Sequence, residues 1–371
     1  MNNNTKNLSP TKLIISKLAL ANNVMAYRKS LNTTTKIMLM IKAFGYGSGD
    51  VAIARFLEEQ KLVDYLGVAY PNEGIALRDE GISLPIMVMN PGIIDLEQFA
   101  AFNLEPTIYN PEQLNQILQL NPQDIAHIKI HFKIDSGMHR LGFHYEEIAA
   151  AAKNLHAYDV QVEGIYTHLA SSPEPLHDNF TREQVTYFNK SYDLLRSLLG
   201  YDPMRHVLNS AGIIRFPEYQ YDMVRAGMGI YGIDPSNERQ KDFHLISRFT
   251  TKISQINTLN IGETVGYLRR GDIKKDNTHV AILPVGYADG YNRLFSNGAV
   301  SVFINGHRAP TIGNVCMDMC FIDVTGIHCN VGDEVELFGP NINIQELASA
   351  AKTIDYEILT SIGMRVKREY E

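Results

Sequence analysis

Ile37-Met-Leu-Met-Ile-Lys-Ala-Phe-Gly-Tyr-Gly-Ser-Gly49 joins a short apolar run to a glycine-rich loop and places Lys42 at the junction. An apolar run of this length is typical of a buried strand. An amine in apolar surroundings loses proton affinity and becomes a nucleophile, while glycines leave backbone N–H groups accessible to an anion. The stretch therefore predicts a barrel-strand end that forms a Schiff base with a phosphorylated aldehyde such as pyridoxal 5′-phosphate (PLP).

The same stretch also has plainer interpretations. A lysine that ends a strand is often a surface residue whose stem covers apolar side chains. The Gly45-x-Gly47-x-Gly49 spacing differs from the dinucleotide-binding fingerprint, and the stretch lacks the Gly-Lys-Ser/Thr of a P-loop. The loop alone therefore does not identify the anion.

Outward from this stretch, residues 20–236 alternate short β-branched runs with amphipathic helical segments. The expected strands are 36–42, 65–70, 84–89, 105–109, 128–135, 161–168, 206–209 and 223–225. Eight such repeats predict a (β/α)8 TIM-like barrel of the α/β class rather than an open sheet. One outer helix is expected to start at the capping box Thr181-Arg-Glu-Gln184 and to stop at Gly200.

A polar linker at 234–242 ends this alternation, and strands without intervening helices follow. They are expected at 245–259, 279–283, 300–304, 311–324 and 334–338, with Gly, Asn and Asp between them. We therefore predict a barrel over 12–236 and a C-terminal, mainly antiparallel β-domain over 237–371. Asn343-Ile-Gln-Glu346 is expected to cap a last helical segment that continues, with a break, to Ile362.

Composition narrows the class of protein. The chain has 371 residues, 45% apolar and 20% charged, which suits a soluble enzyme of two domains. A net charge of −7 gives no electrostatic attraction to nucleic acid. Cys316, Cys320 and Cys329 form no complete disulfide set and lack the paired spacing of a zinc site, so a reducing compartment is expected.

The N-terminal stretch 13–21 is apolar and could be mistaken for a secretory signal. Lys17 interrupts it and a helical pattern follows, so a strand entering a helix is the better interpretation. No run has the length of a membrane span. Met1 and the Asn-rich start fit a free-standing chain, and we expect a cytoplasmic protein without membrane or nucleic-acid partners.

Six separated motifs occur in the order found in alanine racemases. They are Ile41-Lys-Ala-Phe-Gly-Tyr-Gly47, His131-Phe-Lys-Ile-Asp-Ser-Gly-Met-His-Arg-Leu-Gly142, Asn209-Ser-Ala-Gly-Ile-Ile-Arg-Phe-Pro217, Asp222-Met-Val-Arg-Ala-Gly227, Pro284-Val-Gly-Tyr-Ala-Asp-Gly290 and Gly313-Asn-Val-Cys-Met-Asp318. The chain resembles this family from about residue 12 to its end. The resemblance implies a PLP-bearing barrel followed by a β-domain, which the strand at 13–16 joins.

The resemblance also implies a cofactor site in which Lys42 forms the internal aldimine with PLP. The other cofactor-binding positions that it marks are Tyr46, His168, Asn209, Ser210, Arg225, Gly227, Met228 and Tyr356. Hydroxyl and backbone N–H groups among them suit a phosphate dianion because they donate hydrogen bonds. His168 is expected to pack against the pyridine ring. Taken singly, each of these residues would more often serve packing or a turn.

Arg225 matches the family arginine that faces the pyridine nitrogen. A guanidinium donates hydrogen bonds but accepts none, so it disfavours a protonated pyridine. The carbanion should then stay near Cα and be reprotonated there, which favours racemisation over transamination. Outside the motif, an ion pair of Arg225 with an acidic residue such as Asp222 would be an equally good account.

Racemisation needs a proton-transferring group on each face of a planar intermediate, and the second match is Tyr267. In the family this tyrosine comes from the other subunit, which implies a homodimer with shared sites. Because tyrosine has an ordinary pKa of about 10, its surroundings must stabilise the phenolate. Arg140 is placed by resemblance near this base and the substrate carboxylate. Lys133 matches a carbamylated lysine, although strand alternation alone also explains it.

Weaker matches are Met317 and Asp318, which the family contributes to the substrate pocket across the dimer, and Tyr287 at its entrance. Departures occur at Phe44, where the family usually has Asp or Asn, and at Ser48, where it has His. With these two departures, the stretch Ala43-Phe-Gly-Tyr-Gly-Ser-Gly49 resembles that of racemase modules fused to a muropeptide ligase. His127 and His131 suggest a metal pair, but four-residue spacing converges only on a helix, so no catalytic metal is expected.

These observations together predict an alanine racemase that interconverts L-alanine and D-alanine through a PLP external aldimine, supplying D-alanine for peptidoglycan. Three alternatives stay open. The first is a racemase for another amino acid such as serine. The sequence does little to exclude it, because one hydroxyl or methylene changes the binding free energy by only about 1–3 kcal/mol. An amino-acid decarboxylase would not need Tyr267. A PLP carrier built on the barrel alone would not need the β-domain.

Overall fold

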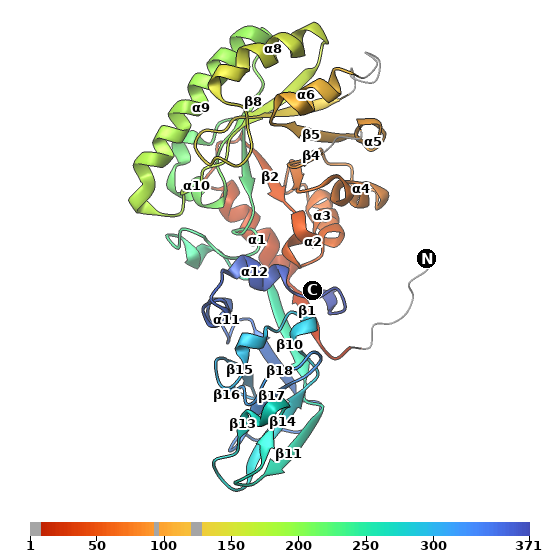
Figure 1. Cartoon of the computed structure of the whole chain (residues 1–371), viewed down its shortest axis with the longest axis vertical. Coiled ribbons are helices and arrows are strands. Elements are labelled where there is room, and N and C mark those ends of the chain that lie inside the picture. Colours follow the sequence, from red (N-terminus) through yellow and green to blue (C-terminus); the bar gives the residue numbers. More distant parts are fainter. Residues whose placement is uncertain (1–8, 93–95, 120–127) are drawn as a thin grey trace. The chain divides into compact units, whose positions relative to one another are not determined.

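The computed structural model describes residues 9–92, 96–119 and 128–371 (Figure 1). The chain divides into two compact units. The barrel unit comprises Ala19–Gly45 and Asp50–His244. The β-unit comprises the chain up to Leu18, Tyr46–Gly49 and Leu245–Glu371. The segment Tyr46–Gly49 thus belongs to the β-unit although it follows a barrel strand.

Eight parallel strands form the sheet of the barrel unit. They are β2 (Lys36–Met40), β3 (Tyr65–Val68), β4 (Ile86–Val88), β5 (Leu104–Ile108), β6 (Lys129–Lys133), β7 (Gln161–Tyr166), β8 (Met204–His206) and β9 (Met223–Ala226). Their order is β8-β7-β6-β5-β4-β3-β2-β9. Backbone hydrogen bonds from Asp222 N to Arg205 O (3.2 Å) and from Arg225 N to Leu208 O (2.9 Å) join the two outermost strands. The predicted (β/α)8 barrel is therefore confirmed.

Helices connect these strands and lie outside them (Figure 1). The α-helices are α1 (Lys17–Arg28), α2 (Lys42–Tyr46), α3 (Asp50–Glu59), α4 (Pro71–Asp79), α5 (Leu96–Ala101), α6 (Pro111–Ile117), α8 (Ile148–Ala157), α9 (Asp178–Leu199) and α10 (Ser210–Arg215). Short 3-10 turns are η1 (Tyr145–Glu147), η2 (Pro175–His177), η3 (Pro217–Tyr219) and η4 (Gln240–Asp242). Every residue of β3, β4 and β5 is buried, as expected for parallel strands covered on both faces.

Two sequence expectations for the barrel were wrong in detail. The long outer helix α9 begins at Asp178, one turn before the expected capping box, and Gln184 bonds to the 168–170 loop instead of to a cap. The eighth strand, expected at 206–209, is β8 at Met204–His206. It ends there because Asn209 leaves the sheet to cap α10, its Oδ1 accepting from Gly212 N at 2.9 Å.

The β-unit contains three mainly antiparallel sheets. Its strands are β1 (Lys12–Ile15), β10 (Ser247–Lys252), β11 (Gln255–Leu259), β12 (Thr264–Val265), β13 (Gly271–Asp272), β14 (Thr278–Leu283), β15 (Ser301–Ile304), β16 (His307–Pro310), β17 (Cys320–Asp323), β18 (Glu334–Phe338) and β19 (Lys367–Tyr370). The sheet orders are β16-β15-β18-β10-β1-β19, β11-β14-β17 and β12-β13. The N-terminal strand β1 lies between β10, antiparallel, and β19, parallel.

Short helical elements complete this unit: η5 (Tyr267–Arg269), η6 (Tyr287–Asp289), η7 (Arg293–Phe295), α11 (Ile344–Ala351) and α12 (Asp355–Thr360). Asn343 and Glu346 form the expected capping box of α11. The expected single strand 245–259 is instead β10 and β11, because the chain changes partner sheet at Ile253 and Ser254. The expected strand 311–324 shortens to β17, since Gly313 adopts a left-handed φ of 68° that interrupts extension.

Among the described residues, no helix is both long enough and apolar enough to cross a membrane.

We expect Gly142→Ala to destabilise the barrel unit strongly. Gly142 has a φ of 131°, and a Cβ there would lie 2.3 Å from Asp135 N, in backbone that cannot move aside cheaply. Strain and overlap together should cost about 3 kcal/mol or more. Gly81→Ala is the matched control, because φ is 83° and no atom lies within 4 Å of its Cβ, so only backbone strain of about 1–2 kcal/mol applies. Equal shifts of the urea unfolding midpoint in both variants would contradict this account.

Candidate active site

Lys42 follows β2 and opens a turn with unusual backbone geometry. Ala43, Phe44, Gly45 and Tyr46 all have φ between 50° and 57°, which is a left-handed helical turn. Each L-residue in that conformation costs about 1–2 kcal/mol, so the turn needs external support. Glu73 in α4 supplies it, because Oε1 accepts from Ala43 N at 2.7 Å while Oε2 accepts from Ala69 N at 2.6 Å.

The amine of Lys42 has a lowered pKa. Burial is the main cause, and the positive charge of Arg140 adds to it, while Glu73 acts in the opposite direction. A larger fraction of this amine is therefore neutral near pH 7 than for an exposed lysine. A neutral amine is the nucleophilic form, as the sequence predicted for this residue.

Arg225 is almost completely buried at the end of β9. Nη1 donates to His206 O at 2.5 Å and to His206 Nδ1 at 3.2 Å. Nη2 donates to Thr167 O at 2.7 Å and to Val207 O at 3.2 Å. No described residue accepts from Nε. Burial lowers the pKa of Arg225 to about 10, so the guanidinium stays charged at neutral pH with one N–H group uncommitted.

His168 follows β7 and presents an unsatisfied ring nitrogen. Its Nδ1 is buried and has no hydrogen-bond partner among the described residues. Its pKa lies well below the usual range because of burial first, and then because of the charges on Arg225 and Arg140. Gln184 fixes the loop by donating to His168 O at 3.2 Å and accepting from Ala170 N at 3.0 Å. The ring is therefore a neutral, pre-positioned surface.

Hydrogen-bond donors suitable for an anion gather around Ser210. Its hydroxyl accepts from Gly227 N at 2.8 Å, which holds the turn that follows β9. In the part of the chain that the structure describes, Met228 N donates to no backbone or side-chain group. The Asn209 side chain is committed elsewhere, since it caps α10, accepts from Ser172 at 2.7 Å and donates to Leu169 O. Asn209 thus positions Ser210.

Two further cationic residues belong to this end of the barrel unit. Lys133, the last residue of β6, is buried, and its pKa falls to about 8 because of burial, Arg140 and Arg225, in that order. Arg140 is exposed on a turn that Asp135 holds, since Asp135 Oδ1 accepts from Gly137 N and His139 N, each at 3.0 Å. Arg140 lies close enough to affect the pKa of Lys42, Lys133 and His168.

The barrel unit thus brings together an amine, an uncommitted guanidinium N–H, an orphaned histidine nitrogen and an unpartnered backbone N–H. This donor set fits PLP, whose aldehyde requires an amine and whose phosphate requires N–H and O–H donors. Of the predicted residues, the unit supplies Lys42, Arg140, Lys133, His168, Asn209, Ser210, Arg225, Gly227 and Met228. The remaining predicted residues belong to the β-unit.

Tyr46 and Tyr356 lie close together within the β-unit. Their ring centroids are 6.1 Å apart, and burial raises the pKa of Tyr46. The loop between Tyr46 and Gly49 packs tightly here, because Arg368 donates to Gly47 O at 2.8 Å and a Cβ on Gly47 would lie 2.1 Å from Leu359 O. Ser48 is fully buried, and its hydroxyl has no partner within residues 9–92, 96–119 and 128–371.

Tyr267 stands on a strained turn and is 70% exposed. The next two residues, Leu268 and Arg269, have φ of 60° and 52°, and Asn314 Nδ2 donates to Tyr267 O at 3.1 Å. A tight turn of this kind holds the backbone of Tyr267 in place while its ring stays accessible.

The segments of Tyr287 and Met317 are bonded to each other within the β-unit. Tyr287 N donates to Cys316 O at 3.0 Å, and Ala288 N donates to Met317 O at 3.1 Å. Asp318 pairs with Arg365 at 2.7 Å. The side chains of Tyr267, Tyr287 and Met317 are all exposed.

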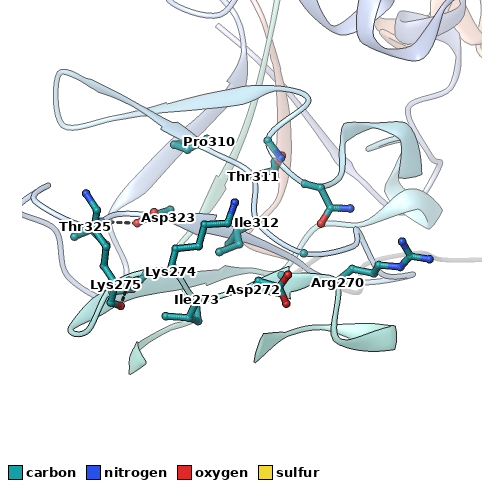
Figure 2. Close-up of a pocket in the computed structure, with 15 residues that line it drawn as sticks. Arg270, Asp272, Ile273, Lys274, Lys275, Pro310, Thr311, Ile312, Asp323 and Thr325 are labelled. Carbon is teal, nitrogen blue, oxygen red and sulfur yellow. Dashed lines mark hydrogen bonds between the residues drawn. The ribbon is translucent and has the colours of Figure 1, made fainter. Parts of the chain in front are cut away.

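The β-unit also contains a hollow of about 580 Å³ that the sequence did not predict. Figure 2 shows its wall, formed by Arg270, Gly271, Asp272, Ile273, Lys274, Lys275, Thr278, Asn297, Gly298, Pro310, Thr311, Ile312, Gly313, Asp323 and Thr325. None of the predicted site residues lines it, although it begins three residues after Tyr267.

No group of three or more metal-ligating side chains occurs in the described ranges. His131 lies in β6 and bonds to Glu105 and His206, whereas His127 lies outside the described residues. Glu73 and Gln184 were missed by the sequence interpretation. The position of Glu73 in the first turn of a helix could have been predicted, because Pro71 precedes it by two residues. Its hydrogen bond to the turn after Lys42 could not, because that contact joins segments distant in the sequence.

Comparison with known proteins gives a consistent picture. Residues 15–235 match the family described as alanine racemase, N-terminal domain, and residues 246–370 match alanine racemase, C-terminal domain. An alanine racemase of Methanococcus maripaludis is 36% identical over 369 residues, covering 95% of this chain and 96% of the relative. A solved alanine racemase structure from Clostridium difficile 630 has a TM-score of 0.92 at 32% identity, covering 98% and 96% of the two chains. Another, in complex with cycloserine, has a TM-score of 0.88 at 30% identity, covering 97% of this chain and 95% of that one.

We expect Arg140→Gln to raise the pKa of the Lys42 amine, because a neighbouring positive charge that disfavours the ammonium form is removed. The midpoint of pH-dependent acylation of Lys42, followed by mass spectrometry on protein free of PLP, should move to higher pH. Arg55→Gln is the control, since Arg55 is an exposed residue of α3 paired with Glu80. An unchanged or lowered midpoint in Arg140→Gln would show that Arg140 does not act on Lys42.

Proposed function

Because the chain belongs to the alanine racemase family and is thus an amino-acid racemase, we propose that it interconverts L-alanine and D-alanine with PLP as cofactor. The observation that carries the proposal is the lowered pKa of Lys42 at a barrel-strand end, beside the donor set described above. When bound, PLP supplies an electron sink that stabilises negative charge at the substrate Cα.

In this proposal Lys42 binds the aldehyde carbon of PLP. Its phosphate is held by the hydroxyls of Tyr46, Ser210 and Tyr356 and by the N–H groups of Gly227 and Met228, with Asn209 holding Ser210 in position. The neutral ring of His168 packs on the pyridine face. The uncommitted Nε of Arg225 would donate a hydrogen bond to the pyridine nitrogen, and because a guanidinium gives up no proton readily it would favour the unprotonated form of that nitrogen. This arrangement limits transamination.

The two bases are Lys42 and Tyr267. With D-alanine, Lys42 would take the α-proton and Tyr267 would deliver a proton to the opposite face, which gives L-alanine. In the reverse direction the two residues exchange these roles. Arg140 binds the substrate carboxylate and lies near the phenolate that Tyr267 must form. Met317 and Asp318 line the substrate pocket, and Tyr287 lies at its entrance. No metal ion takes part in this scheme.

We further propose that the active enzyme is a homodimer in which Tyr267, Tyr287, Met317 and Asp318 serve the partner's barrel. The exposure of Tyr267, Tyr287 and Met317 is compatible with this, because a residue that serves another chain must be accessible on the surface of its own chain. The product, D-alanine, would supply peptidoglycan of the cell wall. Three free cysteines fit synthesis in the reducing cytoplasm.

The proposal is tested by incubating the purified protein with PLP and each L-amino acid and following the loss of optical rotation. L-Alanine should racemise fastest, and Lys42→Ala should lose both this activity and the absorbance of the bound cofactor. Faster loss with L-serine would instead assign a different substrate to the same site.

Replacing Tyr267 with Phe should leave cofactor absorbance intact while racemisation falls in both directions. Removal of a general base that is also the acid of the reverse reaction should cost about 10²–10⁴-fold. Exchange of the D-alanine α-proton with solvent should partly survive, because Lys42 remains. Tyr158→Phe, another exposed tyrosine, is the control. Wild-type racemisation by Tyr267→Phe would place the second base elsewhere.

Mixing Lys42→Ala with Tyr267→Phe under subunit exchange should restore activity, if the sites are shared. One site of each mixed dimer then holds both intact bases and the other holds neither, so recovery should approach about half of the wild-type rate per mixed dimer. Either variant alone, put through the same exchange, is the control. Inactive mixed dimers would show that both bases act within one chain.

We also propose that Lys133 carries a carbamate, whose negative charge orients Arg140. Only the neutral amine reacts with carbon dioxide, and a pKa of about 8 makes the neutral form accessible near physiological pH. With labelled bicarbonate, a carbon-13 carbamate signal should grow as the pH rises through about 8. It should vanish in Lys133→Gln and persist in Lys129→Gln, a half-buried lysine of the same strand. Persistence in Lys133→Gln would refute the assignment.

A further inference from the structure

The buried charge of Arg225 has no direct counter-ion. All of its side-chain hydrogen bonds go to carbonyl oxygens and to His206, and its guanidinium carbon lies 5.1 Å from the centroid of the Tyr166 ring. No carboxylate in the described ranges forms an ion pair with it. A fully desolvated cation is costly unless a compensating negative charge is connected to it. The hydrogen bond from Arg225 to His206 is the first of a series that ends at a carboxyl group, that of Glu105.

A continuous chain of hydrogen bonds runs from Arg225 across the barrel interior. His206 Nε2 lies 3.2 Å from His131 Nδ1, and His131 Nε2 lies 2.8 Å from Glu105 Oε2. His131 and His206 are completely buried, and Glu105 is nearly so. The chain therefore links a buried guanidinium to a buried carboxylate through two imidazole rings on β6 and β8.

The donor-only chemistry of arginine fixes the direction of every bond in this chain. Because Arg225 can only donate, His206 Nδ1 must be an unprotonated acceptor, so the proton of His206 is on Nε2. That N–H then donates to His131, whose Nδ1 must also be unprotonated. His131 therefore carries its proton on Nε2 and donates it to Glu105. In this chain both histidines are therefore neutral, and Glu105 Oε2 is the last acceptor.

Neighbouring residues hold the two rings in this geometry. The His206 ring stacks on Tyr166 at 4.9 Å between centroids, and the His131 ring meets Tyr65 edge-on at 6.1 Å. Gly164, which pairs with His131 in the β6–β7 register, leaves room for the contact. A Cβ on Gly164 would lie 2.8 Å from His131 Nδ1 and 3.1 Å from His206 Nε2, which is where the two rings meet.

We propose that Glu105 is the remote counter-charge of Arg225, and that His131 and His206 are positioning residues that transmit it as a one-directional chain of hydrogen bonds. The chain holds Arg225 in a single orientation, in which Nε has no hydrogen-bond partner among the described residues. Its consequence for catalysis rests on the proposed function, in which that Nε meets the pyridine nitrogen. The other groups facing the chain include Tyr65, whose hydroxyl lies 3.4 Å from Glu105 Oε1, and Glu163, 3.5 Å from the same hydroxyl. Arg78 is a further cation on which the charge of Glu105 acts.

The first test needs neither variants nor cofactor. Nitrogen-15 NMR of histidine-labelled protein free of PLP, near pH 7, should show that the two slowly exchanging, buried histidines are both neutral and both protonated at Nε2. An Nδ1–H tautomer or an imidazolium at either residue would overturn the proposal, since the chain could not then run from Arg225 to Glu105. The same result, obtained with a protein that does not racemise alanine, would overturn only the proposed function.

The second test separates charge from packing. Glu105→Gln keeps an acceptor for His131 but removes the charge, so kcat should fall about tenfold with KM nearly unchanged. Glu163→Gln is the matched control, because Glu163 also contacts Tyr65 but stands outside the chain, and it should keep the wild-type kcat. Equal kcat values for the two variants would refute a role for the Glu105 charge.

A third variant interrupts the chain without altering any of its members. Gly164→Ala should speed exchange of the His206 Nε2 proton with water and lower kcat, because the added methyl group enters the contact between the two histidines. Gly67→Ala in β3 is the control, since the atoms nearest to its Cβ would belong to the flexible side chains of Met40 and Met38. Unchanged histidine exchange in Gly164→Ala would contradict the proposal.

Discussion

The burial of a permanently charged guanidinium, Arg225, is the constraint on which the functional end of the barrel depends. Its donors require acceptors inside the protein, and the carbonyls of Thr167, His206 and Val207 provide them. These carbonyls lie just beyond β7 and at the end of β8, so both strands must stop where they do for the oxygens to turn toward Arg225. Strand length and residue burial are thus linked through one side chain.

A second constraint is the left-handed turn that follows Lys42. Non-glycine residues adopt this conformation only where surrounding contacts enforce it, and such strain is concentrated at functional sites. Glu73 enforces it on the barrel side by holding Ala43 N and the end of β3 with one carboxylate. Directly after Lys42 the turn directs the chain away from the strand axis. The amine of Lys42 therefore stays at the end of the barrel strand.

The sequence predicted the eight strands, the β-domain and a lysine at the end of a barrel strand, because apolar periodicity and glycine-rich turns are local signals. It did not predict that α9 begins at Asp178 or that the 245–259 segment divides between two sheets, since these depend on partners far along the chain. The hydrogen-bond chain of Glu105, His131 and His206 could not be predicted from the sequence either. Alternation placed His131 on a strand, but only the barrel register brings it beside Gly164 and His206.

We propose that this barrel holds PLP so that the substrate Cα is reprotonated and the amino group is not transferred. The most direct measurement follows L-alanine by NMR with the PLP-loaded protein in deuterium oxide. The account predicts equal amounts of both enantiomers, deuterated at Cα, without accumulation of pyruvate. Conversion of alanine to pyruvate, or deuterated L-alanine without any D-alanine, would contradict it.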